Sequence, residues 1–112
     1  MPAIPINVQA SSTAVRSTIF TCPDDSRVVF GRIAIFNRTG SVSTETLSLA
    51  PEGAAHSDAQ VIDAPLVEPR TTRNIGMVIL EPGDVLRALS GAGSATYTLF
   101  GIRFSDFPEG SV

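Results

Sequence analysis

Glu81 and Asp84 are the side chains whose type and spacing first suggest chemistry in this sequence. They lie three residues apart in LEPGDVLRALSG (80–91), on either side of Pro82-Gly83. Two carboxylates could carry out acid–base catalysis or bind a hard cation such as calcium. Calcium requires more oxygen ligands than this pair supplies, whereas Pro followed by Gly is typical of a type II turn. We therefore interpret Glu81, Pro82, Gly83 and Asp84 as a structural turn between two strands.

His56, the only histidine, is the second candidate, with Ser57 and Asp58 directly after it. A Ser–His–Asp triad is defined by geometry, but adjacent residues of one loop cannot adopt the required spacing. A zinc site needs three or four ligands, and a lone histidine does not provide them. We expect an exposed loop histidine, no catalytic residue, no metal and no cofactor. An enzyme that uses His56 with Asp58 or Glu81 is kept as a rival hypothesis.

The amino-acid composition argues against a nucleic-acid partner and against a disulfide within the chain. The chain has 112 residues, a net charge of −3, eight basic residues and one cysteine, Cys22. All the basic residues are arginines, and they are scattered, so a nucleic-acid partner is not expected. A single cysteine excludes an intrachain disulfide, and we predict that Cys22 is half-buried. No apolar run is long enough to span a membrane, and no secretory signal is recognised, so synthesis in a cytoplasm is expected.

Short runs of Val, Ile, Phe and Thr between turn residues dominate the chain, while helical periodicity is absent. This pattern predicts an all-β fold: a single antiparallel β-sandwich of about eight strands. Residues 1–13 are predicted as an N-terminal arm or edge strand, 14–104 as the sandwich domain and 105–112 as a C-terminal tail. The expected strands cover residues 3–10, 14–22, 27–37, 42–50, 61–67, 71–80, 84–90 and 95–104.

Two of these segments suggest contacts between subunits. The strand 27–37 has apolar residues on both faces if its alternation is unbroken, which predicts cover on both sides. The segment 3–10 could add a strand to a neighbouring subunit, or it could fold back on its own sheet. The final strand, 95–104, together with Phe107 is a further candidate contact surface. The candidate subunit contacts are therefore Ile4, Ile6, Val8, Phe30, Phe36, Phe104 and Phe107.

Three stretches taken together resemble small virion proteins of tailed bacteriophages. The first is IFTCPDDSRVVFGRIAIFNRTGSVSTETLSLA, the second is PEGAAHSDAQVIDAPLVEPRTT, and the third is GMVILEPGDVLRALSGAGSATYTLFGIRF. The resemblance covers about residues 18–104 and rests on strands and turns in a particular order. The sequence departs from the pattern at Cys22, where Val is usual, and at PDDS (23–26), which replaces a Pro-Ala-Gly-Lys turn.

The resemblance implies a jelly-roll-like sandwich of the kind found in capsid decoration (cement) proteins, head fibres and tail-fibre or baseplate modules. It implies a virion protein of a kind that frequently assembles as trimers, and it leaves the place on the virion open. Our leading hypothesis is a non-enzymatic protein that decorates and stabilises the capsid as a homotrimer in contact with the major capsid protein. The alternative is a tail-fibre, baseplate or host-receptor module whose loop 51–60 binds glycan. A content of one Tyr and no Trp disfavours a sugar-stacking platform.

Overall fold

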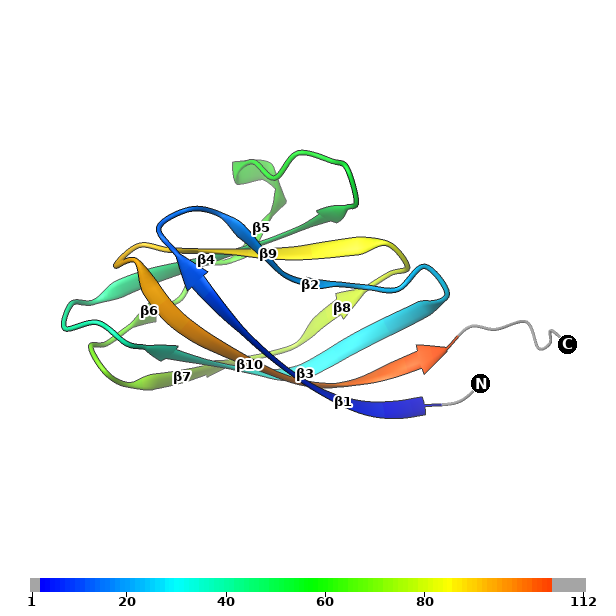
Figure 1. The fold of residues 1–112 in the computed structure, drawn as a ribbon, viewed down its shortest axis with the longest axis horizontal. Coiled ribbons are helices and arrows are strands. Elements are labelled where there is room, and N and C mark those ends of the chain that lie inside the picture. Colours follow the sequence, from blue (N-terminus) through cyan, green and yellow to red (C-terminus); the bar gives the residue numbers. More distant parts are fainter. Residues whose placement is uncertain (1–2, 106–112) are drawn as a thin grey trace, which may run out of the picture.

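The computed structural model describes residues 3–105 and contains two antiparallel five-stranded sheets packed face to face (Figure 1). The predicted all-β sandwich is confirmed. No helix in the described chain has the length and apolar character needed to cross a bilayer. The elements are β1 (Ala3–Thr13), β2 (Ser17–Thr21), β3 (Ser26–Asn37), β4 (Ser43–Pro51), η1 (Asp58–Gln60), β5 (Val61–Asp63), β6 (Leu66–Val67), β7 (Thr72–Ile75), β8 (Val78–Leu80), β9 (Asp84–Ser90) and β10 (Ser94–Ser105).

The two sheets are assembled from strands distant in sequence. Sheet A has the order β1-β10-β3-β7, with β8 also paired to β3. Sheet B has the order β2-β9-β4-β5, with β6 also paired to β4. The segments 61–67 and 71–80 were each expected to form one strand, but each forms two short strands. The two strands of the first segment, β5 and β6, both pair with β4, and those of the second, β7 and β8, both pair with β3. In the first, Pro65 has no N–H for a ladder, so a break near it is expected.

The N-terminal segment is an edge strand of sheet A. β1 pairs with β10 along its whole length, from Ala3 opposite Phe104 to Thr13 opposite Ser94. In this structure the segment therefore pairs within its own chain. Side chains of Ile6, Val8 and Ala10 point toward the core and are partly buried against it.

A β-bulge at Gly31 changes the phase of β3. Gly101 of β10 lies opposite Phe30 and Phe100 lies opposite Arg32, so Gly31 is the extra residue. Before the bulge Val28 and Phe30 are buried, and after it Ile33 and Ile35 are buried. The prediction that this strand has two apolar faces is therefore wrong. The buried residues are even-numbered before the bulge and odd-numbered after it, but all of them lie on the same inward face. Less apolar surface is left outside than unbroken alternation predicts.

Gly101 is needed where β10 passes the bulge. A Cβ placed on Gly101 would lie 2.3 Å from the Val29 carbonyl oxygen and 2.7 Å from Phe30 Cδ1, both well inside van der Waals contact. A Cβ on Gly31 would meet nothing within 4 Å. Of the two glycines at the bulge, only Gly101 is therefore required by close packing.

We predict that Gly101→Ala lowers the free energy of unfolding by at least about 2 kcal/mol, because the two strands must separate to admit the methyl group. Gly31→Ala is the matched control and should change stability by less than about 1 kcal/mol. Urea unfolding followed by circular dichroism measures both. Equal effects of the two substitutions would contradict the close approach of β10 to β3.

Candidate functional site

The outer face of sheet A carries a row of apolar side chains that runs across four strands. Pro5 lies opposite Ile102, Ile102 opposite Val29, and Val29 opposite Ile79. Paired residues on antiparallel strands point to the same side of a sheet, so the row forms one continuous strip. Ile102 is 42% exposed and Ile79 is 49% exposed. We call this row together with Phe100 and Phe104 the contact face.

The contact face contains a shallow hollow of about 400 Å³. Its lining comes from β3 and β10 around the bulge and consists of Val29, Gly31, Phe100, Gly101, Ile102 and Phe104. At its rim the Arg32 guanidinium carbon lies 4.2 Å from the centre of the Phe100 ring, a cation–π contact. Exposed apolar surface with a polar rim is typical of protein-binding sites.

The predicted contact residues are distributed over three environments. Phe104 belongs to the contact face, and Phe36 is 37% exposed further along β3. Phe30 is fully buried, with its ring 5.0 Å from that of Phe20 in an edge-to-face arrangement. Its prediction as a subunit contact is corrected, because Phe30 points into the core on the same side of β3 as Val28. Phe107 lies outside the described residues.

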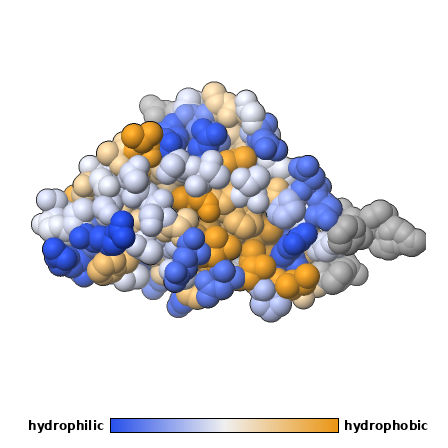
Figure 2. Space-filling view, in the orientation of Figure 1, coloured by the Kyte–Doolittle hydropathy of each residue, from blue (hydrophilic) through white to orange (hydrophobic). Residues whose placement is uncertain are grey.

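Ile4, Ile6 and Val8 lie along the open side of the sandwich. Their side chains point to the same side as the core, but β1 is the last strand of its sheet, so the cover is incomplete. Ile4 is 46% exposed, and the other two are half-buried. Figure 2 shows a band of apolar residues from the centre of the visible face toward its lower right, where Figure 1 places β1.

The residues Glu81 to Asp84 form a turn between β8 and β9. The Asp84 N–H donates to the Glu81 carbonyl at 3.0 Å, and Gly83 has a φ of +83°, as the third residue of a type II turn requires. The Glu81 N–H donates to Asp84 Oδ2 at 3.0 Å, and Glu81 pairs with Arg27 at 2.9 Å. Both carboxylates have local partners. Among residues 3–105, no three His, Cys, Asp or Glu side chains gather as a metal site would need.

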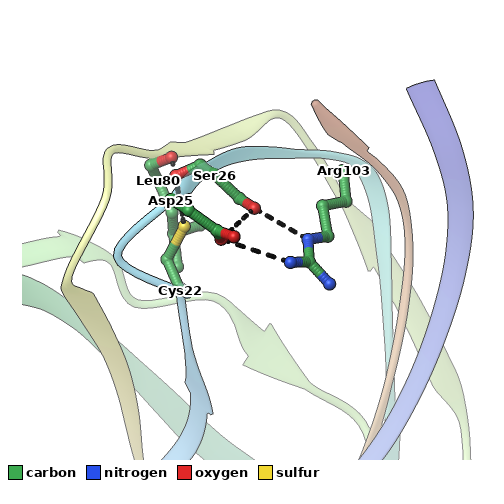
Figure 3. A network of polar contacts seen from close by, with 5 residues as sticks. All are labelled: Cys22, Asp25, Ser26, Leu80 and Arg103. Atoms are coloured by element: carbon green, nitrogen blue, oxygen red, sulfur yellow. Dashed lines mark hydrogen bonds and ion pairs between the residues drawn. The ribbon is translucent and has the colours of Figure 1, made fainter. Parts of the chain in front are cut away.

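Cys22 and Arg103 belong to a polar network at one end of the sandwich (Figure 3). Arg103 Nε donates to Ser26 Oγ at 2.7 Å, and Arg103 Nη2 lies 3.2 Å from Asp25 Oδ1. The hydrogen bond from Ser26 is the main reason that the pKa of Asp25 is lowered. The network ties β10 to the turn before β3, which is the PDDS segment.

Cys22 is 1% exposed, so it is fully buried and not half-buried as predicted. Its thiol lies 3.2 Å from the Ser26 carbonyl oxygen. Burial, reinforced by the charge of Asp84, raises the pKa of the thiol. A buried thiol with a raised pKa is a poor nucleophile, so the structure gives Cys22 a packing role.

His56 packs against the outer face of sheet B. Its Nδ1 lies 2.7 Å from Ser48 Oγ, while its carbonyl oxygen accepts a hydrogen bond from Arg16. Desolvation, followed by the charges of Arg87 and Arg16, lowers the pKa of the imidazole. Ser48 is 0% exposed, and the Ser57 hydroxyl donates to Gln60 instead. His56 is partly buried, not an exposed loop residue as expected, and Ser57 is not bonded to it.

Sequence reasoning missed the most connected polar group, the carboxylate of Glu45. Glu45 is 0% exposed and lies on the inward face of β4. Its Oε1 accepts from Ser12 at 3.0 Å and from the Tyr97 hydroxyl at 2.8 Å. Its Oε2 accepts from Ser43 at 2.5 Å and from Ser90 at 2.7 Å. Glu45 lies two residues before Leu47 on the same strand, so strand alternation places both side chains on the inward face. That alternation was the sequence signal that could have identified Glu45 as buried.

This cluster joins the two sheets and is built for cohesion. Ser12 and Tyr97 come from sheet A, while Ser43 and Ser90 come from sheet B. Burial, together with the bond to Glu45, raises the pKa of Tyr97 far above its ordinary value of 10.0. Four hydroxyl groups donate hydrogen bonds to the carboxylate, and the cluster is closed to solvent, so it has a structural role.

The surface that remains open to a partner is the candidate functional site. It consists of the contact face and the neighbouring edge of β1.

Comparison with known proteins supports the fold. No protein-family model matches this sequence, and no curated protein sequence matches it. A solved structure of the Bacillus endospore appendages, a family of disulfide-linked pili, aligns with 93% of this chain and 87% of its own, with a TM-score of 0.58 and 11% identity. At that identity the likeness shows a shared fold.

A second solved structure is a mutant VP2 protein of infectious bursal disease virus from derived T=1 particles. It aligns with 94% of this chain but only 32% of its own, with a TM-score of 0.42 and 13% identity. The likeness is too low to support an inference about this chain.

We predict that Glu45→Ala lowers the free energy of unfolding by about 3 kcal/mol or more, because four buried hydroxyls lose their shared acceptor. Glu52→Ala, at an exposed position after β4, is the matched control and should change stability by less than about 0.5 kcal/mol. Chemical denaturation measures both. A loss no greater than that of the control would show that the carboxylate does not hold the sheets together.

Alkaline conditions should destabilise the fold through Tyr97. Above pH 10.0, the ordinary pKa of tyrosine, the unfolded chain releases this proton while the folded chain keeps it. Stability is therefore present below that pH and falls above it, by up to about 1.4 kcal/mol per pH unit. Tyr97→Phe lacks this contribution. The stability difference between wild type and Tyr97→Phe, measured across this range, should shrink as the pH rises; a constant difference would contradict the prediction.

Proposed function

We propose that the protein is a non-enzymatic structural subunit of a virion or of a comparable extracellular assembly, and that it works by protein–protein contact. The contact face is the observation that carries this proposal. It places the exposed Ile79 and Ile102 in one row with the half-buried Val29, on the outside of a sheet whose inner face is already packed. Burying that row against another protein surface would add binding free energy through the hydrophobic effect.

Decoration of a tailed-phage capsid is the finer form of the proposal. The protein would be made in the cytoplasm of the bacterial host and would become part of the virion as a homotrimer beside the major capsid protein. The resemblance in strand and turn order supports this assignment. The strand orders β1-β10-β3-β7 and β2-β9-β4-β5 support a jelly-roll-like arrangement, since each sheet joins strands distant in sequence.

Noncovalent contact fits this chain better than covalent linkage. The pilus that shares its fold is disulfide-linked. Here the sole cysteine, Cys22, is 1% exposed, and its thiol is turned toward the Ser26 carbonyl. Copies of this chain would therefore associate through apolar burial and hydrogen bonds.

The glycan-binding alternative has less support, because the loop 51–60 contains no Phe, Tyr or Trp on which a sugar ring could stack. The only tyrosine, Tyr97, is fully buried and bonded to Glu45, and the chain has no tryptophan. Capsid decoration, or an equivalent position in a fibre or baseplate, is therefore preferred to recognition of a receptor sugar.

The test is self-association measured by sedimentation velocity over a range of concentrations. We expect the wild type to form oligomers and Ile102→Lys to weaken their association at least about tenfold, because a charge in the buried core of an interface is strongly disfavoured. Leu66→Lys, at a 55% exposed position on β6 of the other sheet, should leave association unchanged. A wild type that is monomeric at every concentration, or that is insensitive to Ile102→Lys, would overturn the role of the contact face.

A further inference from the structure

β1 is a long sheet edge without the usual protection. Natural edge strands are kept from pairing by charged side chains, prolines, bulges or short length. The 11 residues of β1, AIPINVQASST, contain no charge, and Pro5 is its only ladder-breaking residue. In the described part of the chain, the other edge strands have five residues or fewer: β2, β5, β6, β7 and β8. β1 is therefore the edge best suited to accept another strand.

The side chains of β1 add a second reason. Ile4, Ile6 and Val8 alternate on the side that faces the core, and their burial is incomplete because β1 is the last strand of sheet A among residues 3–105. Figure 2 shows apolar residues exposed along this side of the molecule. A strand added here would satisfy the free backbone groups and would also cover these side chains.

We propose that β1 pairs antiparallel with β1 of a second copy, around a two-fold axis perpendicular to sheet A. The pairing rests on the proposed self-association and adds a second surface to it, the β1 edge, beside the contact face. It would join two copies of sheet A into one continuous sheet, an isologous contact in which each chain contributes the same strand.

The sequence of β1 is complementary to itself in this arrangement. When Ile6 lies opposite Ile6 of the second copy, Ile4 lies opposite Val8, and residues 3–9 of each chain are paired. Opposite residues in an antiparallel pair project to the same side, so the apolar side chains of both copies meet. Since the strand has no charge, no like charges are brought together.

The occupant is a second copy rather than an unrelated strand because this match needs no other sequence. Pro5 lies opposite Asn7 in the same register, and it withholds at most one N–H per chain from the new ladder. The β1 pairing leaves the contact face free, because the second copy joins the edge of sheet A whereas the contact face lies on the outer side of that sheet.

Sedimentation velocity of Ile4→Lys tests the pairing. The substitution places a charge among the apolar side chains of the proposed seam, and we expect dimer formation to weaken at least about tenfold. Ile4 is 46% exposed, so the monomer should remain folded, as circular dichroism would verify. Val15→Lys is the matched control: it makes a similar change at a 72% exposed position in the turn after β1, and dimer formation should be unchanged.

Disulfide trapping provides a second, independent measurement. Directly opposite residues of an antiparallel pair have Cα atoms about 4.5 to 5.5 Å apart, within the range a disulfide spans. Ile6→Cys should therefore yield a covalent dimer on oxidation, whereas Thr72→Cys, on the exposed opposite edge of sheet A, should not. The native Cys22 is buried and does not compete.

The outcomes separate this pairing from the broader function. A wild type that is monomeric at every concentration, with no covalent dimer from Ile6→Cys, would overturn both the pairing and the proposed self-association. An oligomer that is insensitive to Ile4→Lys and is not trapped by Ile6→Cys would overturn the β1 pairing alone. Loss of dimer with Ile4→Lys but not Val15→Lys, together with trapping at position 6, would establish the pairing.

Discussion

The buried carboxylate of Glu45 is the interaction on which the rest of the sandwich depends. A carboxylate removed from water is costly unless hydrogen bonds replace its hydration. Here Ser12, Tyr97, Ser43 and Ser90 supply them, two from each sheet. The arrangement fixes register, because a shift of β4 by one residue would turn Glu45 outward and leave all four hydroxyls without their acceptor. Cohesion of the two sheets is thus specified by a polar cluster as well as by apolar packing.

Because the Glu45 cluster and the core hold the two sheets together from inside, the side chains on the outer surface of sheet A are not needed to join the sheets. The bulge at Gly31 lets β3 bury Phe30 and Ile33 on the same side, although their spacing is odd. Two residues next to the bulge point outward. Val29, before it, belongs to the contact face, and Arg32, after it, lies over the Phe100 ring at the rim of that face. A local irregularity in one ladder therefore decides which apolar side chains are offered to a partner.

Much of the fold could be predicted from the sequence because strand alternation and Pro or Gly turns are local signals. The sandwich, most strand positions and the turn at Pro82-Gly83 depend only on such signals. The bulge could not be predicted, because Gly31 is compatible with an ordinary strand, and Gly101 comes to lie beside the bulge only through tertiary pairing. Glu45 was missed for a similar reason: its hydroxyl partners are spread from residue 12 to residue 97.

The pairing of Ala3 with Phe104 brings the two ends of the described chain to one corner of sheet A (Figure 1). A short linker between them would produce a closed chain, and the chain could then be reopened at an exposed turn, which makes the fold a candidate for circular permutation. Cargo joined at either of these two positions would start from the same corner. In an assembly joined through β1, such cargo would be displayed at two points related by the symmetry axis.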